Sequence, residues 1–268
     1  MSGGRFANLE FDDKNEQPES AAPPWESDTK HANEIRDAQY YMERAIEREL
    51  AGDHNKALRS YSAALGENPL LLDAWVGQLL MLLELAEFRE ANLWADKALE
   101  KFPDTPRLLA AKSVALFRMG RQRDGRKLND AAIMGKGESW LVWLCRGELM
   151  LADSRSAAED CFQHAVRLSE RPDITQLRIG GVCYRYKKYH MAFSMLQEAS
   201  STLVSSALLW YLMGKTQEGL GLLSQALVSF RQAVELAPAN EKYRRALQGE
   251  GQSTAGWITG LFRRWWST

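Results

Sequence analysis

Small residues recur along the chain at a near-constant interval, inside segments whose apolar positions follow a helical period. The alanines of a first series are 34, 34, 33, 34 and 34 residues apart, at Ala64, Ala98, Ala132, Ala165, Ala199 and Ala233. A second series lies seven residues upstream of the first, at Ala57, Ala91, Gly125, Ala158, Ala192 and Ala226. Seven residues are two turns of an α-helix, so each pair of small residues lies on one helix face. The pattern therefore predicts one closely packed helix in every period.

A third position of the same stripe lies between the two small residues of each pair. It is occupied by Tyr61, Ala95, Asn129, Phe162, Leu196 and Phe230. Small residues let neighbouring helices approach closely, and a large residue between them fills the remaining gap. The third copy departs from this pattern at Gly125 and Asn129. We expect this copy to be the least stable, because a glycine inside a helix costs about 1 kcal/mol relative to alanine.

Turn residues bound each of these helices. They precede it at Gly52-Asp53, Ala86-Glu87, Gly120-Arg121, Asp153-Ser154, Lys187-Lys188 and Gly221. They follow it at Pro69, Pro103, Gly135, Gly137, Pro172 and Pro238, where proline cannot continue a helix and glycine favours its exit. Each period also holds a first helix, with tryptophan at its fourth position in three copies. The fourth copy is one residue short, and we place the deletion in its inter-helix turn because that keeps Trp143 and Gly147 in register. The alternative is a deletion before the first helix, which would move Gly147 one position along.

A repeat of this length is a helix–turn–helix unit that cannot bury its apolar face alone. Stacked copies bury one continuous core, so the sequence predicts an elongated all-α solenoid. The last copy shows the full pattern, with Trp210, Gly214, Gly221, Ala226, Phe230, Ala233 and Pro238. In these residues the chain resembles the tetratricopeptide repeat family, over roughly residues 38–240. The resemblance implies a right-handed superhelix of about six repeats with a C-terminal capping helix, acting as a protein-interaction scaffold or adaptor.

The resemblance also implies a partner-binding groove, since the first helix of each repeat lines the concave face in this family. Carried onto this chain, the groove residues are Val76, Leu80, Leu83, Val114, Phe117, Leu144, Leu177, Tyr184 and Tyr211. Such an apolar groove suits a peptide or an amphipathic helix. The alternative is that these side chains pack against adjacent repeats. The family's pattern for capturing a C-terminal carboxylate is absent, because Met42 and Ile46 stand at the positions concerned.

Basic residues lie near the implied groove, at Arg107, Lys112, Arg118, Arg178, Arg185 and Lys215. Two interpretations remain open at this point. They flank an acidic ligand, or they are ordinary solvated charges.

The repeats divide the chain into four parts. We expect an acidic disordered tail over residues 1–28, the six-repeat array over 29–240, a capping helix over 241–249, and a flexible break with a Trp-rich helix over 250–268. The first long helix is expected to begin near Asp28 or Thr29. Within the N-terminal tail, Phe6, Leu9 and Phe11 form an apolar cluster. This cluster is either a linear motif for a partner or an incidental patch.

The C-terminal segment concentrates large apolar side chains on one broad helical face. These are Trp257, Ile258, Leu261, Phe262, Trp265 and Trp266. We call these six residues the C-terminal anchor. Three alternatives exist for its binding surface: it folds back onto the repeats and autoinhibits them, it binds a partner protein, or it lies in a membrane interface. The last alternative describes a peripheral membrane protein whose repeat array holds cargo.

Composition and charge restrict the classes of function that the sequence supports. The formal net charge of −1 implies no general attraction to nucleic acid. The charge is uneven, since residues 1–34 carry three basic and eight acidic side chains and residues 241–268 carry five and two. Cys145, Cys161 and Cys183 match no metal or redox spacing and favour a reducing, cytoplasmic compartment. We find no catalytic arrangement, expect no cofactor, and predict that the protein is not an enzyme.

Overall fold

The computed structural model describes residues 37–135 and 138–249. Every regular element in these two ranges is a helix, which confirms the predicted all-α repeat array. Two sets of predictions lie outside the described residues, namely the N-terminal cluster of Phe6, Leu9 and Phe11 and the Trp-rich segment from Trp257 to Trp266. The prediction that a helix beginning near Asp28 or Thr29 runs into the first repeat is wrong. The helix of the first repeat begins at Ala38, and the carboxylate of the non-helical Asp37 caps it by accepting from the Tyr40 N–H at 2.9 Å.

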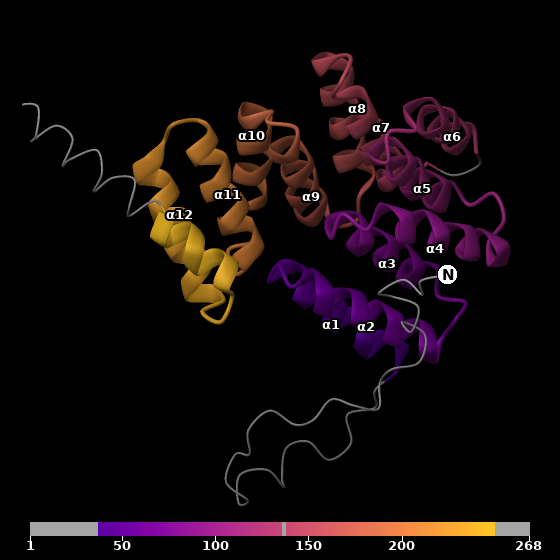
Figure 1. The fold of residues 1–268 in the computed structure, drawn as a ribbon, viewed down its shortest axis with the longest axis horizontal. Coiled ribbons are helices and arrows are strands. Elements are labelled where there is room, and N and C mark those ends of the chain that lie inside the picture. Colours follow the sequence, from indigo (N-terminus) through magenta and orange to yellow (C-terminus); the bar gives the residue numbers. More distant parts are fainter. Residues whose placement is uncertain (1–36, 136–137, 250–268) are drawn as a thin grey trace, which may run out of the picture. The chain divides into compact units, whose positions relative to one another are not determined.

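Twelve helices pair into six successive hairpins, labelled in chain order in Figure 1. The pairs are α1 (Ala38–Leu50) with α2 (His54–Glu67), α3 (Leu72–Glu84) with α4 (Phe88–Lys101), α5 (Pro106–Arg118) with α6 (Gln122–Met134), α7 (Trp140–Met150) with α8 (Arg155–Leu168), α9 (Pro172–Arg185) with α10 (Tyr189–Ala199), and α11 (Ala207–Gly219) with α12 (Leu223–Leu236). Residues 241–249 form a further helix. We call the first helix of each hairpin its A helix and the second its B helix.

The chain divides into two compact units. The first comprises Met1–Glu49 and Asp53–Lys136, and the second comprises Leu50–Gly52 and Gly137–Thr268. The first three hairpins lie essentially in the first unit, apart from the turn residues 50–52. The last three hairpins and the helix over residues 241–249 lie in the second unit.

The small residues of the repeat are packing positions of the B helices. All six alanines of the first series are at most 1% exposed, and every member of the second series is buried. The six stripe residues between them are buried too. This burial confirms that the recurring small residues mark close helix contacts. Asn129 is fully buried with them, although neither of its side-chain amide atoms has a hydrogen-bond partner among the described residues.

Glycines in the A helices receive the large stripe side chains of the B helices. A Cβ atom added at Gly147 would lie 2.4 Å from the Phe162 ring, and one added at Gly214 would lie 2.5 Å from the Phe230 ring. These contacts join the two helices of a hairpin. The absence of a side chain on the A helix therefore sets how closely the hairpin closes.

Two tryptophans hold the segment that precedes their own A helix with equivalent hydrogen bonds. The Trp75 indole N–H donates to the Pro69 carbonyl at 3.0 Å, and the Trp210 indole N–H donates to the Val204 carbonyl at 2.8 Å. In both hairpins the acceptor lies six residues before the tryptophan. A buried or half-buried indole needs such a partner, and here it ties the exit of one hairpin to the start of the next.

The turn between A and B helices has the same backbone form in five hairpins. Its central residue has a positive φ, between +58° and +86°, at Gly52, Ala86, Gly120, Lys187 and Gly221. In each case the following N–H donates to a carbonyl five residues earlier, as Glu87 does to Leu82. This is the Schellman ending, which satisfies carbonyls left over at the helix terminus.

The fourth turn differs, because the missing residue is the left-handed one. Here α7 ends early at Met150, and the N–H groups of Asp153 and Ser154 both donate to the Met150 carbonyl at 2.9 Å. The start of α7 lies a full repeat period after the start of α5, whereas the start of α8 falls a single position short of a full period after that of α6. The prediction that the deletion lies in the inter-helix turn is therefore confirmed.

Three pairs of successive A helices contact one another, each pair within one unit. Helix α3 packs on α5, α7 packs on α9, and α9 packs on α11. The B helices instead pack between their own A helix and the next one, as α10 does between α9 and α11. Among the described helices, no two B helices show comparable contact. Since the A helices lie closer together than the B helices, each unit curves toward its A-helix side.

The helix over residues 241–249 covers the last hairpin. Tyr243 is 1% exposed and stacks on Tyr211, with ring centroids 4.8 Å apart. Arg244 and Arg245 are exposed. The ammonium of Lys242 lies over the Tyr211 ring, 4.6 Å from its centroid. The helix thus buries one aromatic side chain against the end of the core and places one of its cations over the same tyrosine that Tyr243 stacks on.

Candidate functional site

Most of the nine predicted groove residues belong to the packed core. Seven are buried, namely Val76, Leu83, Val114, Phe117, Leu144, Leu177 and Tyr211. Leu80 and Tyr184 are half-buried. A ligand can reach these two side chains without a change in packing, so they mark where the A-helix face is accessible. The role of all nine in binding a partner stays a prediction.

The basic residues near the predicted groove are engaged within the protein. Arg107 forms an ion pair with Asp73, and Lys112 forms one with Asp96. The Arg118 guanidinium donates to the Leu83 carbonyl at 2.9 Å. The Arg178 guanidinium lies over the Trp140 ring, 5.1 Å from its centroid. These cations join neighbouring helices, which favours the structural interpretation of their charge.

In the second unit, α9 and α11 bring polar and aromatic groups together on the A-helix face. Tyr184 comes from α9, and Tyr211, Lys215 and Glu218 come from α11, with Lys215 and Glu218 forming an ion pair. Burial raises the pKa of the Tyr184 and Tyr211 hydroxyls. Burial alone would lower the pKa of Lys215, but the hydrogen bond and charge of Glu218 raise it. Lys215 is therefore a cation and both tyrosines are neutral at physiological pH.

Gly181 leaves room beside this group. A Cβ atom added there would meet its nearest neighbour, Leu212 Cδ1, at an ordinary contact distance of 3.5 Å. Tyr184 lies one helical turn farther along α9, on the same face as Gly181. This part of the A-helix face combines a half-buried tyrosine, a glycine one helical turn away and the Lys215–Glu218 pair. We call it the α9–α11 face.

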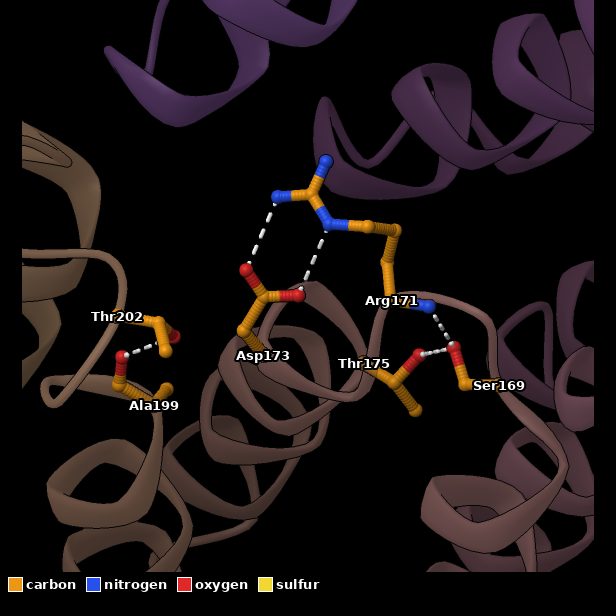
Figure 2. A network of polar contacts seen from close by, with 6 residues as sticks. All are labelled: Ser169, Arg171, Asp173, Thr175, Ala199 and Thr202. Carbon is orange, nitrogen blue, oxygen red and sulfur yellow. Dashed lines mark hydrogen bonds and ion pairs between the residues drawn. The ribbon is translucent and has the colours of Figure 1, made fainter.

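A polar pocket of about 610 Å³ lies where two hairpin exits meet in the second unit. It is lined by Glu170, Arg171, Pro172, Asp173, Gln176, Gln197, Glu198, Ser201 and Thr202. Figure 2 shows that its charges are paired with one another: the Arg171 guanidinium donates to both Asp173 carboxylate oxygens, at 3.1 and 2.9 Å. This hydrogen bonding lowers the pKa of Asp173. Gln176 likewise donates to Glu198 at 2.7 Å, so the side-chain donors of Arg171 and Gln176 have partners within the pocket.

A second pocket of about 610 Å³ lies at the opposite ends of these hairpins, among the A–B turns. Its lining combines cations with apolar side chains, namely Arg155, Lys187, Lys188, Tyr189, His190, Met191, Phe193, Gly219, Leu220 and Leu222. We call it the basic pocket. Sequence reasoning treated Lys187 and Lys188 as turn residues only. The signal that could have found the pocket is the repeat period, which places residues 155, 189 and 223 at equivalent positions at the starts of B helices.

The described residues offer little for catalysis or metal binding. In the ranges 37–135 and 138–249, no three His, Cys, Asp or Glu side chains are grouped to hold a metal ion. Cys145, Cys161 and Cys183 are buried, and none of them forms a disulfide with another described residue. Burial, together with the charges of Glu148 and Glu159, raises the pKa of Cys183 to about 12. A thiol with such a pKa stays protonated and is a poor nucleophile.

No helix in the part of the chain that the structure describes combines the length and the apolar character needed to span a membrane.

Comparison with known proteins places the last hairpin in a sequence family. Residues 207–240 match the family model described as Tetratricopeptide repeat. An uncharacterized protein of Methanocaldococcus jannaschii is 37% identical over 58 residues, which are 22% of this chain and 67% of that protein.

Solved structures of helical repeat proteins resemble the fold at low sequence identity. The structure titled as the APC/C hetero-tetramer Cut9-Hcn1 is 16% identical with a TM-score of 0.49, over 80% of this chain and 43% of that chain, so less than half of its length is matched. A thermophilic TPR protein of Thermus thermophilus is 18% identical with a TM-score of 0.46, over 80% of this chain and 98% of that one.

Proposed function

The chain belongs to the tetratricopeptide repeat family, and from that premise we propose that it is a protein-interaction scaffold that binds a peptide or an amphipathic helix on its A-helix side. The fold itself suggests a protein-interaction scaffold. The finer proposal is that the α9–α11 face contacts the ligand, with Leu80 on α3 as a separate contact point in the first unit.

One observation carries this proposal, namely that consecutive A helices pack side by side while the B helices do not. Within a unit, a surface built this way is continuous between the hairpins whose A helices touch and curves toward the ligand, which suits an extended or helical peptide. Tyr184 and Lys215 supply what such a surface needs at its centre, an aromatic side chain and a fixed charge. Tyrosine is enriched among the residues that dominate binding energy, and a fixed charge contributes to specificity.

Affinity capture with variant baits tests the proposal. We expect Tyr184→Ala, in the full-length chain, to weaken capture of the genuine partner by about fivefold or more, because an aromatic side chain at a binding hot spot is worth more than about 1 kcal/mol. The matched controls are Val228→Ala on α12 and Leu93→Ala on α4, which remove side chains that are 63% and 56% exposed on B helices. Partners lost equally from all three baits, or retained by Tyr184→Ala, contradict binding on the A-helix side.

The Trp-rich segment beyond residue 253 supplies the regulatory part of the proposal. Its apolar face has the character of a groove ligand, so we propose that it competes with the partner for the A-helix side. Deleting residues 254–268 is then expected to raise the affinity of a purified partner, and unchanged affinity contradicts competition. Liposome flotation of the intact and truncated chains tests the membrane alternative, which requires binding that is lost on truncation.

A further inference from the structure

We propose that the basic pocket is a docking site for the chain's own N-terminal segment, residues 6–13. The proposal concerns a different surface from the α9–α11 face and does not depend on what binds there. It rests on three features: unpaired cations at the rim, an apolar floor, and a segment of the same chain with the opposite charge.

The rim of the pocket carries cations that the fold leaves available. Lys187 and Lys188 are exposed, and neither side chain forms an ion pair with another described residue. Arg155, across the pocket, is paired only with an exposed neighbour on its own helix, Glu159, at 2.9 Å. In the polar pocket, by contrast, Arg171 and Asp173 hold each other. The charges of Lys187 and Lys188 in the basic pocket are therefore not neutralised by a carboxylate of the described residues, whereas the charge of Arg171 in the polar pocket is neutralised by Asp173.

The floor of the pocket is apolar and preformed. Met191 is 5% exposed, and Leu222 remains 39% exposed at the edge. The Tyr189 ring lies on the backbone of Gly219, where an added Cβ atom would come within 2.6 Å of the ring. This packing of α10 against the end of α11 holds the floor open next to the lysines. A ligand for this site therefore needs a large apolar side chain with acidic groups beside it.

The N-terminal segment has that composition. Residues 6–13 read Phe-Ala-Asn-Leu-Glu-Phe-Asp-Asp, with three large apolar side chains and three carboxylates. The other terminal segment has the wrong sign, because residues 241–268 carry five basic and two acidic side chains. Opposite charge both attracts a ligand and selects against a like-charged competitor.

A long connection joins the segment to the fold. Residues 14–37 separate the segment from the start of α1, and 24 extended residues reach about 80 Å. A tether of this kind gives the segment an effective concentration of the order of millimolar at sites it can reach. Weak contacts to Lys187, Lys188 and the apolar floor then suffice to hold it.

Site-specific photo-crosslinking in the full-length chain tests this inference. A benzoylphenylalanine introduced at Phe11 is expected to crosslink, within a single chain, to residues 187–193 or 219–222. The same group at Trp257 serves as the control and is expected to give no crosslink there. Crosslinks from position 11 to other regions, or only between two chains, overturn the proposal.

Charge reversal and salt identify the cause of any such crosslink. We expect Lys187→Glu with Lys188→Glu to lower its yield about tenfold, because attraction becomes repulsion within a Debye length. The double variant Arg244→Glu with Arg245→Glu makes the same change of charge on the helix over residues 241–249 and is expected to leave the yield unchanged. Raising sodium chloride from about 0.1 to 1 M should also lower the yield without any substitution. The proposal is overturned if the crosslink yield changes neither with the lysine charge reversal nor with the salt concentration.

Discussion

Gly180 on α9 lies directly against the Leu196 side chain of α10, so that an added Cβ atom would sit 2.6 Å from both Cγ and Cδ2 of the leucine. The next residue, Gly181, has 3.5 Å to its nearest neighbour. Two adjacent glycines in one helix thus have opposite roles. The first sets the closing distance of the fifth hairpin, and the second leaves the α9–α11 face open.

Alanine substitution at these two glycines should change the free energy of unfolding in opposite directions. Gly180→Ala forces Leu196 or the helix backbone to move, and overpacking of this kind costs about 1–3 kcal/mol. Gly181→Ala meets only ordinary contacts and gains about 0.5–1 kcal/mol from helix propensity. Urea unfolding followed by circular dichroism compares the two variants. Equal effects would mean that the contact with Leu196 does not limit hairpin closure.

The left-handed turn residue of the second hairpin offers a stabilising substitution. Ala86 has a φ of +61°, where Gly52, Gly120 and Gly221 stand in three other hairpins. A left-handed conformation costs a residue with a Cβ atom about 1–2 kcal/mol, so Ala86→Gly is expected to raise the free energy of unfolding by about 1 kcal/mol. Ala98→Gly, inside α4, is the matched control and should lower it. A destabilised Ala86→Gly protein would show that the turn carries no such strain.

Replacing the buried Asn129 by leucine should stabilise the third hairpin. Its amide oxygen and nitrogen are buried without partners in the described structure, and such groups cost about 1–3 kcal/mol. Leucine has a similar volume and is the residue at the equivalent position of the fifth hairpin, Leu196. We expect the thermal unfolding midpoint to rise, with the larger rise in any transition assigned to the first unit by hydrogen exchange. A lower midpoint would indicate that the amide has a partner in solution.

The Cys183 thiol gives the protein a stability that is lost at high pH. Its ordinary pKa of 9.0 rises to about 12 in the fold, so above pH 9 the native state holds a proton that the unfolded chain has released. The contribution is complete below about pH 9 and falls as the pH rises toward 12. The urea midpoint should therefore decrease from pH 8 to pH 10, and by less in Cys183→Ala. Rapid alkylation of Cys183 in the native protein at pH 8 would argue against the raised pKa.

The repeat architecture could be predicted from the sequence because its signal is local. The small residues Ala57 and Ala64 and their equivalents are spaced by two helical turns, and that spacing fixes which helix face is buried. The same local signal located the deletion in the turn before Ser154. Tyr243 was missed, since a single tyrosine among charges gives no periodic pattern until Tyr211 is seen to face it.

The candidate site was less predictable, because exposure depends on how neighbouring hairpins close. Leu177 and Tyr184 lie on one face of α9, yet the first is buried and the second is half-buried. The difference comes from packing against α7 and α11, which no spacing within α9 reports. The basic pocket is a similar case, since its lining comes from turns that lie a full repeat period apart in the chain.

The shortened turn over residues 151–154 has a consequence for recombining the protein. The second and sixth hairpins begin and end their helices at the same offsets, so exchanging one for the other at the exit loops keeps the register of both helices. The fourth hairpin lacks the residue on which the Schellman ending depends, and its B helix starts one position early relative to its A helix. In a chimera that duplicates this hairpin, each copy would contain the shortened turn. Such duplications could therefore be used to alter the pitch of the array one hairpin at a time.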